Sequence, residues 1–255
     1  MTIEDFKVAA ARVADAAHWR VQVHPVHYQE SRLGPNNKLK PLISRSAVSL
    51  RGWNFPHVTN RQDEEEAYEG SCYISKCEFD HIAEVWRVCS NGQFVGSFQL
   101  RELDSEWSKR IRGYTGYINN EVTGVLEFGN QIYSITEFYE FAARFAREAN
   151  YTEGIRVRLT LKNILGFGLG TADFNRNLSP IYICRDPEIN FDDTFSFEDI
   201  VGAPHVIAFD KIKRFLDHFD AGGIRSDIIQ QIQREFYSLR IGRDRVDLAS
   251  LSWPD

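Results

Sequence analysis

The sequence predicts an α+β protein with a mixed or largely antiparallel sheet, flanked by helices and followed by a C-terminal helix pair. Strand-like segments follow one another in hairpin-like runs and do not alternate strictly with helices, which disfavours a doubly wound parallel sheet. The last 50 residues carry apolar side chains at helical spacing. We expect a main domain at 1–203 and a helical segment at 204–255 that packs on it.

The first quarter of the chain should form one helix and two strands. Thr2 with Asp5 three residues later is typical of a helix start. Trp19, Val21 and Val23 alternate with polar residues, and Pro25 favours an edge position or a bend for that strand. The expected order is a helix at 3–18, a strand at 19–28, a loop at 29–41 and a strand at 42–53.

The clearest hairpin lies at 81–100, after a further strand candidate at 70–79. Its Asn91-Gly92 pair provides the positive φ angles that a type I′ turn requires. Bulky apolar residues alternate on both sides of the turn. We therefore expect two adjacent antiparallel strands here.

The second half of the chain should alternate helices with strands. Ser134 and Glu137 form a capping-box pattern ahead of a helix that ends near residue 150. Val157, Leu159 and Leu161 alternate with polar residues, which predicts a strand with one wet face. The other expected elements are a helix at 103–112, strands at 125–133, 155–170 and 181–184, a loop with a short extended piece at 185–201, and helices at 204–219 and 224–240.

Composition narrows the classes of function. The net charge of −6 argues against a surface that coats nucleic acid, because phosphate binding requires a positive face. The sequence contains neither an apolar run long enough to cross a membrane nor a leader-like N-terminus, so we expect a cytoplasmic protein without membrane contact. The four cysteines fit no paired spacing and are expected to be buried free thiols, with no metal or cofactor site.

Several partial motifs have simpler structural explanations. GFGLG at 166–170 is not followed by a helix start that could receive a pyrophosphate, so glycines at a strand bend explain it better. The acidic run at 63–69 could belong to a metal-dependent nuclease only if a lysine were placed beside its carboxylates, and no such lysine is present. The run is therefore typical of a solvated loop. Arginines beside the apolar stripe of the last helix indicate a surface helix or a partner-binding helix.

The stretch AVSLRGWNFPHV at 47–58 allows two interpretations. In the first, Trp53 and Phe55 fill one end of the core while Arg51 pairs with an acidic neighbour. In the second, Arg51, Asn54 and His57 gather at one mouth of the sheet as a polar binding site. The residues alone do not decide between them.

Three blocks carry a resemblance to a known domain: SLRGWNFPH at 49–57, HIAEVWRVCSNGQFVGSFQLRE at 81–102 and IYSITEFYEFAARFAR at 132–147. They resemble an uncharacterised bacterial domain found in proteins that bear an Alba/Schlafen-type DNA-binding module. The resemblance implies an accessory or sensor component of a bacterial multi-protein system, such as anti-phage defence. Because 48 residues precede the first block, we expect any such module to come from another chain.

The sequence favours a non-enzymatic interaction module that binds a partner protein, with nucleic acid reached through that partner. One alternative is a hydrolase or nuclease acting on nucleic acid, in which Arg51, His57 and His81 converge with carboxylates. Another is direct nucleic-acid binding by the arginines of 225–245 and the wet face of 156–162. No catalytic residue is predicted, and the candidate binding residues are Arg51, Trp53, Asn54, Phe55, His57, His81, Arg225, Arg234 and Arg240.

Overall fold

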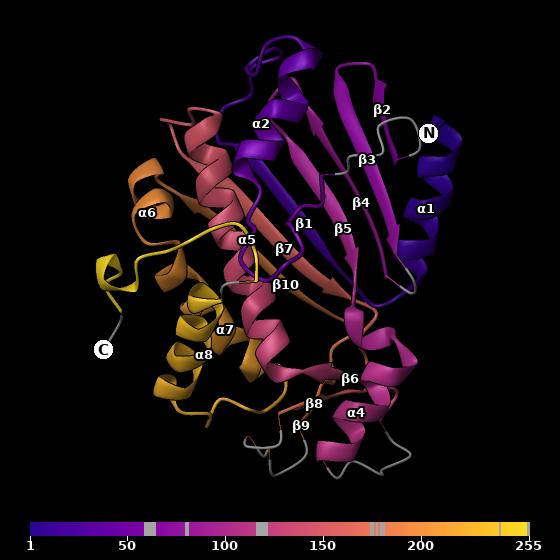
Figure 1. The fold of residues 1–255 in the computed structure, drawn as a ribbon, viewed down its shortest axis with the longest axis vertical. Coiled ribbons are helices and arrows are strands. Elements are labelled where there is room, and N and C mark those ends of the chain that lie inside the picture. The colour runs from indigo at the N-terminus through magenta and orange to yellow at the C-terminus, as the bar shows by residue number, and fades with distance from the viewer. Residues whose placement is uncertain are drawn as a thin grey trace.

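The protein is built on a seven-stranded antiparallel sheet, as a computed structural model shows for residues 1–58, 65–79, 82–115, 122–173, 176, 178, 182–239 and 241–253 (Figure 1). The strand order is β10-β7-β1-β5-β4-β3-β2, and every neighbouring pair is antiparallel. The predicted α+β class is confirmed. The strands are β1 (His18–Pro25), β2 (Glu66–Glu69), β3 (Cys72–Phe79), β4 (Ile82–Cys89), β5 (Phe94–Gln99), β7 (Ile155–Lys162) and β10 (Glu188–Phe195).

A smaller three-stranded sheet lies at one end of the large one (Figure 1). In it β6 (Gly124–Glu127) pairs parallel to β8 (Phe167–Gly170), and β8 pairs antiparallel to β9 (Tyr182–Ile183). Helix α4 (Ser105–Thr115) packs on β6 and β8 and follows the short 3₁₀ turn Arg101–Leu103. The side-chain oxygen of Asp104 accepts two N–H bonds at the start of α4 and caps this helix.

One face of the large sheet is covered by α5 (Phe128–Glu148), whose side chains are buried around almost its whole circumference. It lies between the sheet and the C-terminal helices, which explains why most of its residues are buried. Figure 1 shows α5 crossing in front of the strands with α7 and α8 beside it. The other helices are α1 (Ile3–Asp15), α2 (Leu39–Ser46), α6 (Phe197–Gly202), α7 (Pro204–Asp217) and α8 (Ser226–Ser238), with 3₁₀ turns at Asn36–Lys38 and Leu248–Ser250.

The opposite face is covered over only part of its width. Helix α1 begins with the predicted Thr2–Asp5 capping box and packs on β3, β4 and β5. Arg12 of α1 forms an ion pair with Glu78 of β3, which fixes α1 on this face. None of the described helices packs on the same face over β1, β7 and β10, so polar residues of that half-sheet meet solvent.

Three local expectations are wrong. Residues 39–46 form the helix α2, because Leu39, Leu42, Ile43 and Ser46 fall on one buried helical face. Strand β1 is central, since Pro25 is its last residue and sits where a missing N–H disrupts little of the ladder. The short extended piece expected within the loop at 185–201 is the full eight-residue strand β10, an edge strand whose polar residues alternate with Ile189 and Phe191.

The strand expected at 125–133 ends at Glu127, and α5 begins immediately after it. The side chain of Glu127 accepts the main-chain N–H of Asn130 and caps the helix. Ser134 lies one and a half turns inside α5, so its capping-box pattern with Glu137 is coincidental. Glu137 is instead available for a tertiary contact, described below.

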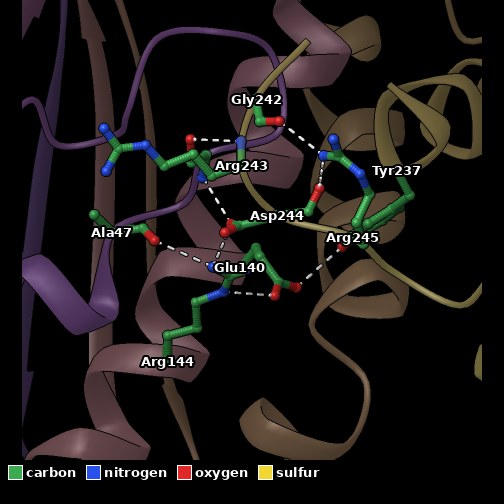
Figure 2. Close-up of polar contacts among 9 residues, drawn as sticks. Ala47, Glu140, Arg144, Tyr237, Gly242, Arg243, Asp244 and Arg245 are labelled. Atoms are coloured by element: carbon green, nitrogen blue, oxygen red, sulfur yellow. Dashed lines mark hydrogen bonds and ion pairs between the residues drawn. The ribbon is translucent and has the colours of Figure 1, made fainter. Parts of the chain in front are cut away.

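The C-terminal segment packs on α5 and forms hydrogen bonds with the stretch at 47–58. Asp244 accepts an N–H bond from Ser49 (2.7 Å) and one from the Arg144 guanidinium of α5 (2.6 Å), and Arg144 also pairs with Glu140. Figure 2 shows Asp244 and Glu140 converging on Arg144, with Ala47 accepting a further bond from it. The N–H of Gly242 donates to Leu50. Residues nearly 200 positions apart therefore form one structural unit.

The expectation of four free cysteines is wrong for two of them. Cys72 and Cys89 are directly opposite in the β3–β4 pair and form a disulfide, while Cys77 and Cys184 are buried thiols. The sequence spacing of 17 gave no sign of this pairing, because it depends on strand register. No helix in the described part of the chain has the length and apolar character needed to cross a bilayer.

We expect two thiols per chain to react with a thiol-specific chromogenic reagent after unfolding without reductant, and four after reduction, because Cys72 and Cys89 are bonded to each other. Absorbance of the released chromophore measures both numbers. In the folded protein, burial of Cys77 and Cys184 should slow their reaction. Four reactive thiols in the unfolded, unreduced protein would show that the disulfide is absent.

Candidate functional site

The stretch at 47–58 lies on the α5 side of the sheet. Val48 and Phe55 form an isolated antiparallel bridge, so the chain doubles back on itself. The ring of Phe55 is buried against three phenylalanines, with centroid distances of 4.6 Å to Phe98, 4.8 Å to Phe138 and 5.4 Å to Phe141. Phe55 is thus a core residue that holds the segment in place.

Arg51 is directed at α5 and pairs with Glu137. The guanidinium lies 2.6 Å from Oε2 of Glu137 and also donates to Asn130 (2.8 Å). The Glu137 side chain is 2% exposed and its second oxygen has no hydrogen-bond partner among the described residues. Burial raises the pKa of Glu137, and Arg51 opposes that shift by favouring the charged form. Arg51 therefore stabilises a buried carboxylate, as the first interpretation of this stretch expects.

His57 lies in a different polar network. Its ring is stacked on Trp53, with centroids 4.3 Å apart, so the partly exposed indole covers the imidazole. The main-chain N–H of His57 donates to Glu84 (2.9 Å), and the indole N–H of Trp86 donates to the carbonyl of His57 (3.0 Å). Both partners belong to β4, so these bonds fix the main chain of His57 on that strand, and the stacked indole fixes its ring.

Glu84 is a buried carboxyl of β4 beneath this segment. Burial raises its pKa to about 8, opposed by hydrogen bonds from the His57 main chain and the Trp53 side chain, while Glu137 and Glu65 raise it further. Burial also lowers the pKa of His57, against a smaller raising effect of Glu65. The raised pKa of Glu84 favours its protonated, uncharged form at neutral pH.

The side chains of His57, Glu65 and Cys77 meet at one point, where one ligand atom from each lies within 4.8 Å of the others. Cys77 is buried, and Nδ1 of His57 is buried without a hydrogen-bond partner among the described residues. Imidazole, thiolate and carboxylate are all metal ligands. The sequence did not predict this group, because the position of Cys77 in the fold depends on the β3–β4 register. That register, which places Cys77 opposite Glu84, cannot be predicted from the spacing of residues.

The other candidate residues do not join this group. Asn54 is half-buried beside Trp53 in the chain. Arg225 pairs with Asp227 at the exposed start of α8 (2.6 Å), and Arg234 stacks over the Trp253 ring at 4.8 Å. His81 and Arg240 lie outside the described residues. The contacts of Arg225 and Arg234 therefore include no residue of the stretch at 51–57.

The uncovered half-sheet is the second candidate region. Residues directly opposite each other in antiparallel strands share a face, so the register defines rows of side chains across the sheet. One row runs through Asp192, Arg158, Gln22, Val95 and Arg87. The next row contains Asn190, Thr160, Arg20 and Ser97. We name this face of β10, β7, β1, β5 and Arg87 the open sheet face.

The open sheet face is basic although the chain is acidic. Asp192 is held between Arg156 (2.6 Å) and Arg158, which lower its pKa to about 2. Neither Arg20 nor Arg87 forms an ion pair or side-chain hydrogen bond within the described part of the chain, and both are exposed. Its charged members are Arg20, Arg87, Arg156, Arg158, Lys162, Glu188 and Asp192.

The sequence predicted the solvent-exposed face of β7 but missed Arg20 and Arg87, because only the pairing of the strands brings these residues beside β7.

Comparison of the chain with protein-family models, with curated proteins and with solved structures gives no match.

Proposed function

We propose that the protein is a non-enzymatic interaction module that binds an acidic surface of a partner protein through the open sheet face. The observation that carries this proposal is the excess of arginine and lysine over carboxylates on a half-sheet that no described helix covers. Arg20 and Arg87 have no acidic partner in the described structure, so their charges are available to a second molecule. The resemblance of three sequence blocks to a bacterial domain supports an accessory or sensor role.

Two features favour a protein over a nucleic acid as the partner. The strand residues on the open sheet face include no Phe, Tyr or Trp, so bases would have no aromatic platform on which to stack. Glu188 and Asp192 lie on the same face and would repel phosphates, and the whole chain carries a net charge of −6. A protein surface of mixed charge, acidic at its centre, fits this pattern better.

The test compares wild type with the double variant Arg20→Glu/Arg87→Glu. Tagged protein is expressed in the native host, captured at several salt concentrations, and the bound material is analysed for protein and nucleic acid. The partner is then purified and its affinity measured by calorimetry. We expect one stoichiometric acidic partner whose binding weakens with salt and falls at least about tenfold in the variant, since opposite charges become like charges.

The matched control is Lys109→Glu/Arg225→Glu, which makes the same change in net charge on α4 and α8. Both residues are strongly exposed and form only surface ion pairs, so their reversal should affect stability little. The control variant should bind the partner as wild type does. Capture of nucleic acid in place of protein, or equal losses in both double variants, would refute the proposal.

A further inference from the structure

We propose that His57, Glu65 and Cys77 bind a zinc ion. The three residues come from separate parts of the fold: the stretch after α2, the residue preceding β2, and β3. Their ligand atoms lie within 4.8 Å of one another. A tetrahedral zinc ion with bonds of about 2.0–2.3 Å holds its ligand atoms about 3.3–3.8 Å apart, so small side-chain rotations complete the geometry.

The ligand set selects the metal. A thiolate and an imidazole suit zinc and disfavour Mg²⁺ and Ca²⁺, which take oxygen ligands. When Cys77 and Glu65 are ionised and His57 is neutral, the two negative charges balance the charge of Zn²⁺. A neutral complex is the least costly form in a partly buried site. Loss of the Cys77 proton on binding makes the affinity rise with pH.

The surroundings support the ligands. The buried Nδ1 of His57 lacks a hydrogen-bond partner among the described residues, a state that a bound metal or a nearby donor would relieve. Trp53 stacks on the imidazole and shields it from water. Glu84 accepts the main-chain N–H of His57 and lies opposite Cys77 in the β3–β4 pair. It is thus placed to position His57 through the main chain of that residue.

This site is independent of the open sheet face. Cys77 and Glu84 point to the α5 side of the sheet, whereas Arg20 and Arg87 point to the other side. Absence of zinc binding would therefore leave partner binding by the open sheet face unaffected, and the reverse also holds. The site differs from the expectation from sequence that no metal is bound, which rested on the spacing of the cysteines.

The test uses the full chain, stripped of metal with a chelator and kept with a non-thiol reductant. It is titrated with Zn²⁺ alone and, separately, with Co²⁺ as a spectroscopic probe. We expect one zinc per chain by elemental analysis after gel filtration. The cobalt form should show a thiolate-to-metal charge-transfer band and the d–d absorption of a tetrahedral site.

Variants identify the ligands. Cys77→Ser should abolish the charge-transfer band and weaken zinc binding more than about 100-fold, beyond the range typical of a residue that only positions a ligand, whereas Glu84→Gln should weaken it about 10-fold. Cys184→Ser is the matched control, because Cys184 is the other buried free thiol and hydrogen-bonds to Asp186 away from this group. It should bind zinc as wild type does.

Cadmium NMR of the wild-type protein provides a readout that no substitution can confound. A chemical shift typical of one sulfur ligand with nitrogen and oxygen supports the site even if Cys77→Ser does not fold. A shift typical of oxygen ligands alone, zinc well below one per chain, or a charge-transfer band that depends on Cys184 would overturn the proposal.

Discussion

Replacing Arg51 by methionine is expected to lower the free energy of unfolding by about 2–4 kcal/mol at neutral pH, because the change leaves a buried carboxylate without its counter-charge. Glu137 is 2% exposed and Arg51 is 25% exposed at its side chain, so the pair is screened far less than a surface ion pair. Asn130 would also lose its guanidinium donor. Denaturation in urea, followed by circular dichroism, measures the loss.

The loss should grow with pH. Burial already raises the pKa of Glu137 above its ordinary value of 4.5, and removal of Arg51 raises it further. A carboxyl group whose pKa is higher in the folded than in the unfolded state stabilises the fold below the unfolded pKa. That contribution disappears as pH rises through the folded pKa. Between pH 5 and pH 8 the Arg51→Met variant should therefore lose stability more steeply than the wild type.

A second substitution separates charge from packing. In the Arg51→Met background, Glu137→Gln removes the carboxylate and should abolish most of the extra pH dependence, with partial recovery of stability at pH 8. If the single variant is equally destabilised at pH 5 and pH 8, the ion pair is not the source of the loss. The lost contact would then be the packing of the Arg51 side chain.

Strong local signals account for the parts of the fold that the sequence predicted. The Asn91-Gly92 turn, the alternation in β7 and the apolar stripe of α5 each lie within one element, where spacing alone is informative. Leu39, Leu42 and Ile43 form an equally local helical stripe, but this stripe was divided between a predicted loop at 29–41 and a predicted strand at 42–53. The start of α5 was predicted too late in the chain, because Ser134 and Glu137 match a capping-box pattern although the helix begins at Phe128.

The candidate site was harder to predict from the sequence, for a related reason. One interpretation of the sequence pairs Arg51 with an acidic residue, because Arg51 lies beside a core segment. The sequence did not identify Glu137 as that residue, because Glu137 was assigned to a capping box. Cys77 and Glu84 become neighbours through the β3–β4 register, and Arg20 joins Arg158 through two further strand pairs. Such contacts between distant residues depend on how strands align, which one sequence does not specify.

Gly242→Ala is expected to release the C-terminal tail from the stretch at 47–58. A Cβ atom at this position would lie 1.9 Å from the carbonyl oxygen of Ser49 and 2.4 Å from its carbonyl carbon. These are main-chain atoms that bridge to Phe55 and the core through Val48, so they cannot simply rotate away. The tail must move instead, and the bonds that Asp244 forms with Ser49 and Arg144 are lost with it.

Loss of these hydrogen bonds should lower the free energy of unfolding by about 2–4 kcal/mol. Trypsin should cleave faster after Arg243, because the main-chain N–H groups of Arg243 and Asp244 donate to Ser49 in the wild type (Figure 2). Gly223→Ala is the matched control, because a Cβ there meets nothing within 4 Å. Since the control makes the same chemical change in an open turn, equal cleavage rates in the two variants would show that the tail is not held at Gly242.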